Sequence, residues 1–114
     1  MHEMSLTEGV VRILEDQAAA HGFTRVKTVW LEIGALSTVV PESMEFCFGA
    51  VAKGNPLTDG ARLEIIRVPG TAWCMDCSAS VVIATRTDPC PGCGGHHLTV
   101  TAGSDMRIKE VEVE

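Results

Sequence analysis

Apolar residues near the start of the chain recur at the spacing of an α-helix, which predicts one buried stripe over residues 6–21. Ser5 and Glu8 have the spacing of a capping box, which would start this helix and leave His2 outside it. Gly22 is a natural residue at which the helix could stop. The predicted stripe consists of Leu6, Val10, Ile13, Leu14 and the polar Gln17.

Residues 25–33 alternate instead, and this pattern predicts a strand with one strongly apolar face. Helical spacing returns from Pro41 and ends at Gly54-Asn55-Pro56, and residues 63–68 alternate loosely as a second strand. A strand, a helix and a strand with short joints form a βαβ unit, so the two strands should be parallel. The apolar positions are Val29, Leu31 and Ile33 in the strand and Met44, Cys47, Phe48 and Val51 in the helix.

The rest of the chain predicts an insertion followed by a closing strand. Residues 81–85 and 98–101 are candidate strands of a small hairpin. Residues 106–113 are also strand-like, and we expect them to join the first sheet because their apolar side chains would be hard to bury in so small an insertion. The predicted fold is α+β, with two helices on a small three-stranded mixed sheet, in the order α-β-α-β-insertion-β. The predicted domains are 1–69 with 104–114, and 70–103.

Two cysteine pairs in the insertion predict a metal site. Each pair has the spacing Cys-x2-Cys, and twelve residues separate the pairs. Two such turns facing each other supply four thiolates at tetrahedral angles, as in a zinc ribbon, whereas a thioredoxin-like redox motif would occur once. Four thiolates leave no open coordination position, so the zinc should be structural and a metallohydrolase is excluded. The predicted ligands are Cys74, Cys77, Cys90 and Cys93.

Composition and charge narrow the classes of function. The 114 residues are 46% hydrophobic but only 4% aromatic, with no tyrosine, so the core should be small and zinc should help to hold it. The net charge of −6 argues against general affinity for nucleic acids or anionic membranes. The chain has neither a run of eighteen apolar residues nor a signal-peptide charge pattern. We therefore expect a cytoplasmic protein, in which the fifth cysteine, Cys47, is a buried thiol.

His2 has two interpretations. Chain ends fray, and a solvated terminal histidine binds nothing. Alternatively, the α-amine of Met1 can bind one ion together with the amide nitrogen and ring Nδ1 of His2, through fused five- and six-membered chelate rings. Glu3 or another backbone amide could fill the fourth place. Such nitrogen-rich, square-planar sites suit Ni(II) or Cu(II) and disfavour zinc.

A set of short motifs extends along essentially the whole chain. The most discriminating is Met1-His2-Glu3-Met4-Ser5-Leu6, placed before an amphipathic helix. The others are Val29-Trp30-Leu31-Glu32-Ile33-Gly34, Pro41-Glu42-Ser43-Met44, Cys74-x2-Cys77, Cys90-Pro91-x-Cys93 and Met106-Arg107-Ile108-Lys109. Together these motifs resemble the HypA/HybF family of hydrogenase nickel-incorporation proteins.

The resemblance implies a nickel metallochaperone and not an enzyme. It would deliver Ni(II) to the large subunit of [NiFe] hydrogenase during maturation, together with a HypB-type GTPase, and some members serve urease maturation proteins as well. The resemblance assigns transferable Ni(II) to His2, Met1 and Glu3, and structural Zn(II) to the four cysteines. The nickel site would belong to the α/β domain of residues 1–69 with 104–114.

The sequence departs from the family at one point. Some members have a histidine directly after a cysteine pair, but here Ser78 and Gly94 occupy those places. A pH-responsive exchange of zinc ligands is therefore not expected. His96 and His97 come later, and we expect them to be solvated groups or neighbours of the site and not ligands, because four thiolates already satisfy the ion.

The alternative function is a zinc-ribbon adaptor that binds a protein or a nucleic acid and has no nickel role. In that case His2 is incidental. The acidic charge speaks against nucleic acid, and steep salt sensitivity in a gel-shift experiment would favour it.

Overall fold

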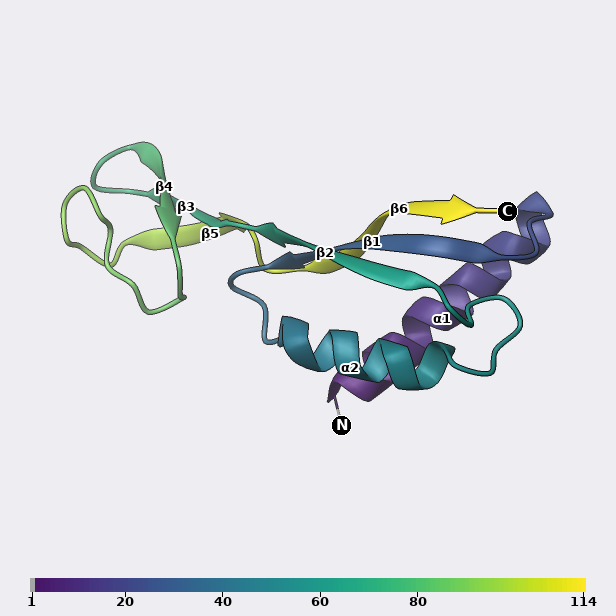
Figure 1. Ribbon diagram of the computed structural model, residues 1–114. Coiled ribbons are helices and arrows are strands. Elements are labelled where there is room, and N and C mark those ends of the chain that lie inside the picture. The colour runs from purple at the N-terminus through teal and green to yellow at the C-terminus, as the bar shows by residue number, and fades with distance from the viewer. Residues whose placement is uncertain (1) are drawn as a thin grey trace. The chain divides into compact units, whose positions relative to one another are not determined.

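The computed structural model describes residues 2–114, and Met1 lies outside the described residues. The chain divides into two compact units. Unit 1 contains Met1–Leu31, Val39–Ile65 and Ile108–Glu114, and unit 2 contains Glu32–Thr38 and Ile66–Arg107. The domain boundaries predicted from the sequence stay a prediction. The elements are α1 (His2–His21), β1 (Val26–Gly34), α2 (Pro41–Ala52), β2 (Arg62–Val68), β3 (Gly70–Cys74), β4 (Ala79–Ile83), β5 (Leu98–Ala102) and β6 (Met106–Val113) (Figure 1).

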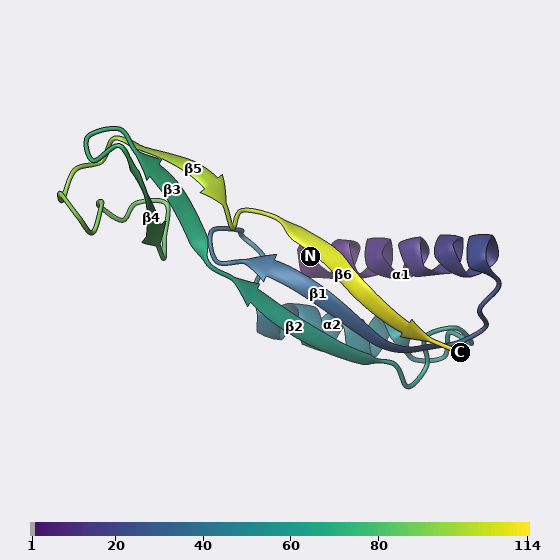
Figure 2. The ribbon, with the colours of Figure 1, turned by 90° about the horizontal axis from the view of Figure 1, so that it is seen from above.

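The strands form two three-stranded sheets, in the orders β2-β1-β6 and β4-β3-β5. The β1 and β2 arrows point the same way and the β6 arrow points the opposite way (Figure 2). The antiparallel pairing of β1 with β6 includes a bond from the Glu114 N–H to the Arg25 carbonyl (2.8 Å) and one from the Gly34 N–H to the Asp105 carbonyl (2.9 Å). The predicted α+β class, with two helices and a small mixed sheet, is confirmed.

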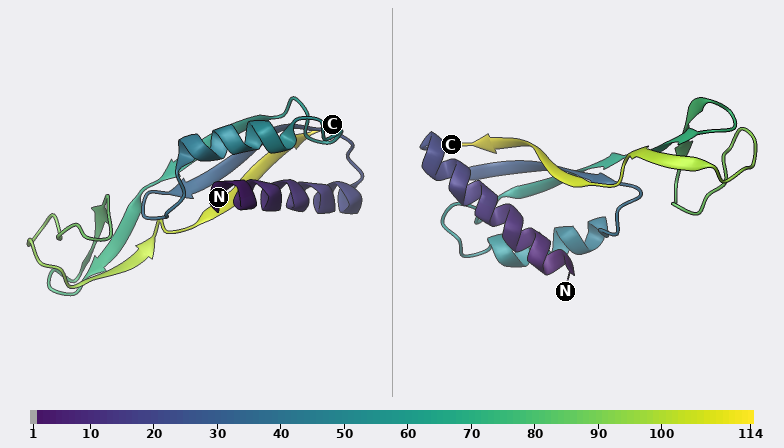
Figure 3. Two further views of the ribbon diagram at one scale, coloured as in Figure 1. Left: turned by 90° about the horizontal axis from the view of Figure 1, so that it is seen from below. Right: turned by 180° about the vertical axis from the view of Figure 1, so that it is seen from behind.

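In unit 1, α1 and α2 lie on the same face of the sheet (Figure 3). Three residues of the apolar stripe predicted for α2 are buried, Met44, Cys47 and Phe48 at 0%, 2% and 3% exposure, whereas the fourth, Val51, is half-buried. Helix α2 packs against α1, and Val29 and Leu31 of β1 are fully buried. The predicted periodicities of β1 and α2 therefore describe real core faces. No helix within residues 2–114 has both the length and the apolar character that a bilayer crossing needs.

The predicted start of α1 is wrong. The helix begins at His2 and not at Leu6, so the expected cap Ser5 is an exposed residue inside the helix. Thr7 is buried, and its hydroxyl donates a hydrogen bond to the Glu3 carbonyl one turn earlier. Ser5 has no capping role because the helix begins three residues before it, at His2, and only the N–H groups at the start of a helix need a cap.

The predicted stripe of α1 is also wrong in part. Val10 and Leu14 are buried as expected, but Ile13 is 51% exposed. Val11, which the prediction left out, is 5% exposed and takes a place in the core. The buried face thus runs through Thr7, Val10, Val11 and Leu14, at spacings of three and four residues, and this is a complete helical stripe that begins with a polar residue.

Unit 2 contains a strand that the sequence did not predict. Strand β3 pairs antiparallel with β4 on one side and with β5 on the other. Its sequence, Gly-Thr-Ala-Trp-Cys, lacks the apolar alternation of a typical strand, so its two neighbours specify it. Strand β4 begins at Ala79 and ends at Ile83, two residues earlier than predicted at each end. The sheet buries a small cluster of Leu36, Ala72 and Ile83, with Val81, Leu98 and Val100 packed against it.

Three glycines of unit 2 allow the backbone to approach itself closely. A Cβ atom on Gly34 would lie 2.0 Å from the Gly103 carbonyl oxygen, and one on Gly70 would lie 2.5 Å from Cγ of Leu36. Gly103 has φ +87°, and a Cβ there would lie 2.4 Å from the Pro69 carbonyl oxygen. The same Gly103 carbonyl accepts a hydrogen bond from the Leu36 N–H (2.8 Å). Any side chain at these positions would force neighbouring atoms apart.

Candidate metal centre

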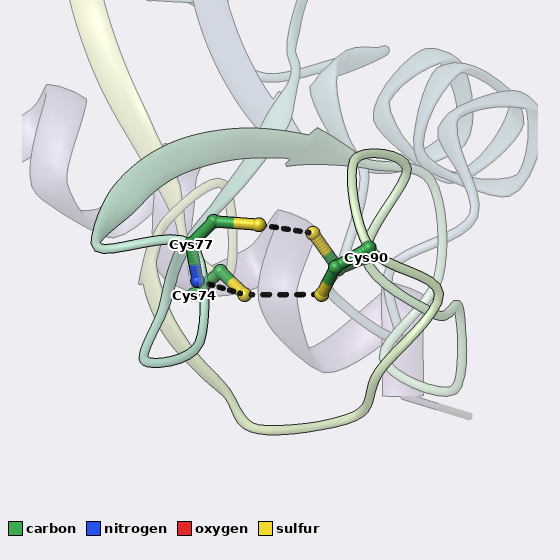
Figure 4. A group of neighbouring side chains, drawn as sticks. Cys74, Cys77 and Cys90 are labelled. Carbon is green, nitrogen blue, oxygen red and sulfur yellow. Dashed lines mark hydrogen bonds between the residues drawn. The ribbon is translucent and has the colours of Figure 1, made fainter.

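Two loops of unit 2 carry the four cysteines of the Cys-x2-Cys pairs, which we call the four-cysteine cluster. Cys74 is the last residue of β3, and Cys77 lies in the turn that leads to β4. Cys90 and Cys93 lie in the loop between β4 and β5. Figure 4 shows the side chains of Cys74, Cys77 and Cys90 converging from the two loops. The structure thus brings together residues that lie up to nineteen positions apart.

The two loops share two features, an N–H group that points at the first sulfur of the pair and a left-handed residue after the second cysteine. In the first, the Cys77 N–H points at Sγ of Cys74 (3.4 Å), and in the second the Gly92 N–H points at Sγ of Cys90 (3.4 Å). The residue after each pair adopts a left-handed conformation, with φ of +51° at Ser78 and +74° at Gly94. These amide donors stabilise negative charge on sulfur, and the left-handed residue turns the chain away after the second cysteine.

The distances between the sulfurs fit a tetrahedral metal ion. Sγ of Cys74 lies 3.7 Å from Sγ of Cys93, and Sγ of Cys77 lies 3.8 Å from Sγ of Cys90. All four sulfurs lie within 4.8 Å of one another, and none forms a disulfide. With Zn–S bonds of about 2.3 Å, a tetrahedron has S···S separations of about 3.8 Å. Zinc would therefore enter the cluster with little movement of the loops.

The cysteines differ in how readily they lose a proton. N–H groups of Cys93 and Gly92 point at Cys90 and lower the pKa of its thiol to about 7. Hydrogen bonds with the side chains of Cys93, Cys74 and Cys90 raise the pKa of Cys77 to about 12. A bound metal ion would lower the pKa of the Cys77 thiol, because thiols that coordinate a metal are deprotonated.

Lowering the pH from about 8 to about 6 is expected to weaken zinc binding by the cluster about tenfold or more. Protons and metal compete for the same sulfurs. Cys90 takes up a proton in this range, which accounts for about tenfold, and the Cys77 thiol, which must release its proton to the metal at either pH, adds to the loss at each pH unit. Competition with a chromophoric zinc chelator measures the change, and equal affinity at both pH values would contradict it.

Hydrogen bonds at the edge of the cluster hold the two loops in place. The Met75 N–H donates to the His97 carbonyl (3.0 Å), and Nδ1 of His97 lies 3.0 Å from Oδ2 of Asp76. Asp76 was not among the residues predicted for the site, because only the fold brings it beside His97. His96 and His97 are exposed, and His97 faces this carboxylate and not the cluster.

A second group of hydrogen bonds orders the loop before Cys90. The Thr85 hydroxyl and the N–H groups of Ala84 and Thr85 donate to the Asp88 carboxylate. The hydroxyl bond contributes most, and together these bonds lower the pKa of Asp88. The loop therefore reaches Cys90 in a defined conformation.

The predicted terminal residues fall in unit 1. Met1 lies outside the described residues, and His2 is the first residue of α1. Glu3 lies in the first turn of α1, and its Oε2 accepts a hydrogen bond from the Val40 N–H (3.4 Å), directly before α2. The start of α1 is thereby tied to the start of α2. No local pattern signals this contact, because the two residues are 37 positions apart.

Comparison with known proteins identifies the family. The model of the family of hydrogenase and urease nickel-incorporation metallochaperones, HypA, matches residues 1–113. The chain belongs to the HypA family. The family is one of maturation factors and metallochaperones, not of enzymes. The chain is 57% identical to the hydrogenase maturation factor HypA of Azotobacter vinelandii and 58% identical to that of Rhodopseudomonas palustris strain TIE-1, each over all 114 residues and 100% of both chains.

Solved structures of HypA proteins share the fold. The solution structure of the nickel metallochaperone HypA from Helicobacter pylori matches with a TM-score of 0.70 and 21% identity, covering 97% of this chain and 96% of that one. A second solution structure of a HypA protein matches with a TM-score of 0.74 and 23% identity, covering 100% of this chain and 97% of that one. The HypA fold is therefore common to chains with widely different sequences.

Proposed function

We propose that this protein binds one Ni(II) ion at its amino terminus and delivers it to the large subunit of [NiFe] hydrogenase during maturation. The observation that carries this proposal is membership of the HypA family along residues 1–113. Delivery proceeds by ligand exchange inside a protein complex. Nickel is the cargo of the protein, and its passage requires no covalent chemistry on this chain.

Met1, His2 and Glu3 are the proposed nickel-binding residues. The first N–H groups of a helix have no carbonyl acceptor one turn earlier, and α1 begins at His2. The amide nitrogens of His2 and Glu3 can therefore bind a metal without the loss of a helix hydrogen bond. Together with the terminal amine and the imidazole, they make a nitrogen-rich set that suits Ni(II). Because the imidazole must be neutral, nickel affinity should fall as the pH drops below about 6.5.

The four-cysteine cluster is the proposed structural zinc site. Four thiolates at tetrahedral spacing suit zinc and leave no position for a second ligand. The zinc would hold residues 70–103 as a ribbon domain, and residues 1–69 with 104–114 would form the nickel-binding domain. Two sites of different chemistry would then keep the resident ion apart from the cargo.

Membership of a family of hydrogenase maturation factors supports the proposed partners. They are a HypB-type GTPase, the hydrogenase large subunit and, where urease is served, urease maturation proteins. With these partners, the proposed location of the protein is the cytoplasm. No feature of the described residues favours the alternative of a nucleic-acid adaptor, and the net charge of −6 opposes it.

An equilibrium Ni(II) titration of zinc-loaded protein with its native amino terminus tests the proposal. We expect one equivalent bound with a square-planar visible spectrum. His2→Ala and a form acetylated at the amino terminus should each weaken binding by about two orders of magnitude or more, because the first loses the imidazole, the second loses the terminal amine, and each therefore loses a chelate ring. Zinc content should stay the same in all forms.

A histidine elsewhere in the same helix supplies the control. His21 lies at the other end of α1 and is exposed, so His21→Ala should bind nickel like the parent protein. Equal binding by all forms, or binding by none, would exclude a terminal nickel site and leave a zinc protein whose partners must be sought directly.

A further inference from the structure

Phe46 is the most exposed large apolar side chain among the described residues, at 75%. It lies on α2 between the buried residues Met44 and Cys47. The helical stripe that packs α2 into unit 1 therefore excludes Phe46, and its ring contributes little to the core. Aromatic residues are enriched at protein–protein interfaces relative to the rest of the surface, and an exposed ring beside a pocket is a candidate contact of this kind.

An open pocket of about 340 Å³ adjoins Phe46. Val40, directly before α2, adds a second apolar side chain near this end of the helix and is 47% exposed. The pocket is lined by Glu3, Glu42, Ser43, Phe46 and Cys47. We call Phe46, this pocket and the exposed Glu45 the Phe46 surface.

The negative charge of the Phe46 surface limits the kind of partner that can bind there. Three carboxylates, those of Glu3, Glu42 and Glu45, accompany the ring. Nucleic acid and anionic membranes would be repelled by these groups and by the net charge of −6. A second copy of the chain would bring the same carboxylates against each other in a symmetric contact. The partner that these charges favour is therefore a different protein. Its binding surface would have an apolar pocket for the Phe46 ring, bordered by lysine and arginine side chains.

Glu3 belongs both to the Phe46 surface and to the proposed nickel site. Glu3 belongs to the first turn of α1, lines the pocket beside Phe46, and accepts a hydrogen bond from the Val40 N–H. Ligand exchange requires the incoming ligands to come within bonding distance of the ion. A protein seated on the Phe46 surface would lie beside the start of α1, where that exchange would occur.

We propose that the Phe46 surface is the docking site for the nickel-free large subunit, with Phe46 inserted into an apolar socket of that subunit. This inference rests on the proposed function, since it takes the terminal nickel as the cargo. Phe46 would supply affinity, and the carboxylates would steer association and fix the orientation.

The test measures binding of the purified, nickel-free cognate large subunit to the zinc-loaded protein in the absence of nickel. Phe46→Ala should weaken binding about thirtyfold or more, because aromatic anchors at the centre of an interface contribute this much. Phe46→Leu should restore part of the affinity. Glu45→Lys should slow association, and the salt dependence of the association rate should decrease.

Ile13→Ala is the matched control, because Ile13 is also exposed, at 51%, but does not line the pocket. It should change binding less than about threefold. Phe46→Ala should also keep the urea midpoint of the parent protein, since the ring is exposed.

Unchanged affinity of Phe46→Ala for the large subunit would overturn the docking proposal, including the case in which only the GTPase loses binding. The docking measurement contains no nickel, so the two proposals can fail separately. If the parent protein binds no nickel but docks through Phe46, the proposed function is wrong and the docking proposal stands.

Discussion

Replacing Cys74 with serine is expected to abolish stoichiometric zinc binding and to unfold the sheet of β4, β3 and β5. Cys74 is fully buried at the end of the central strand, and its Sγ lies 3.7 Å from Sγ of Cys93. Structural zinc contributes about 10–16 kcal/mol to the folding of small domains. The apolar cluster of this sheet has only three buried members, too few to replace that contribution. Zinc analysis and amide hydrogen exchange over residues 70–102 measure the two effects.

Cys47 provides the control for this experiment. It is also buried, at 2% exposure, but it lies on α2 and outside the four-cysteine cluster. Cys47→Ala should lower stability by a small packing cost of about 1 kcal/mol and keep one equivalent of zinc. Retention of tightly bound zinc by Cys74→Ser would mean that three cysteines suffice and that the proposed closed coordination is wrong.

Gly34→Ala is expected to lower the free energy of unfolding by roughly 2–4 kcal/mol. The added methyl group would lie 2.0 Å from the Gly103 carbonyl oxygen and 2.3 Å from its carbonyl carbon. Both contacts are with backbone, which cannot rotate away as a side chain could, so β1 and the turn at Gly103 must separate. The hydrogen bond from the Leu36 N–H to the Gly103 carbonyl would be lost or weakened as well. Urea unfolding of the zinc-loaded protein measures the change.

Gly9→Ala is the matched substitution. Gly9 lies in the interior of α1, and apart from the backbone of its own helix and its chain neighbours, no atom lies within 4 Å of the place that a Cβ would take. Alanine should therefore stabilise the protein by about 0.5–1 kcal/mol. Opposite signs for the two variants are expected. A urea midpoint for Gly34→Ala equal to that of the parent would show that the backbone contact relaxes without cost.

Local pattern predicted those parts of the fold in which one face of an element is apolar throughout. Val29, Leu31 and Ile33 in β1, and Met44, Cys47 and Phe48 in α2, are buried as predicted. The pattern failed where a polar residue belongs to the core. Thr7 is buried at the start of the inner face of α1. The predicted stripe included only apolar positions and Gln17, so it left Thr7 out and assigned the exposed Ile13 to the buried face.

Long-range pairing explains the remaining differences. Strand β3 has a weak sequence pattern, and its hydrogen-bonded neighbours on both sides specify it. The cysteine spacing indicated which residues gather, because two short loops supply all four. The Phe46 surface was not predictable in the same way, since exposure of an aromatic residue depends on which face of α2 packs inward and on the approach of Glu3 from α1.

The paired left-handed residues at Ser78 and Gly94 also bear on evolutionary variation at the metal cluster. Each follows a cysteine pair and has positive φ. Glycine takes this conformation freely, and asparagine, aspartate and histidine adopt it more readily than most residues, whereas β-branched residues are disfavoured. A histidine directly after a cysteine pair, which the resemblance attributes to some members, is therefore compatible with this backbone. Lineages can gain or lose an imidazole beside the sulfurs by substitution at one position, without rebuilding either loop.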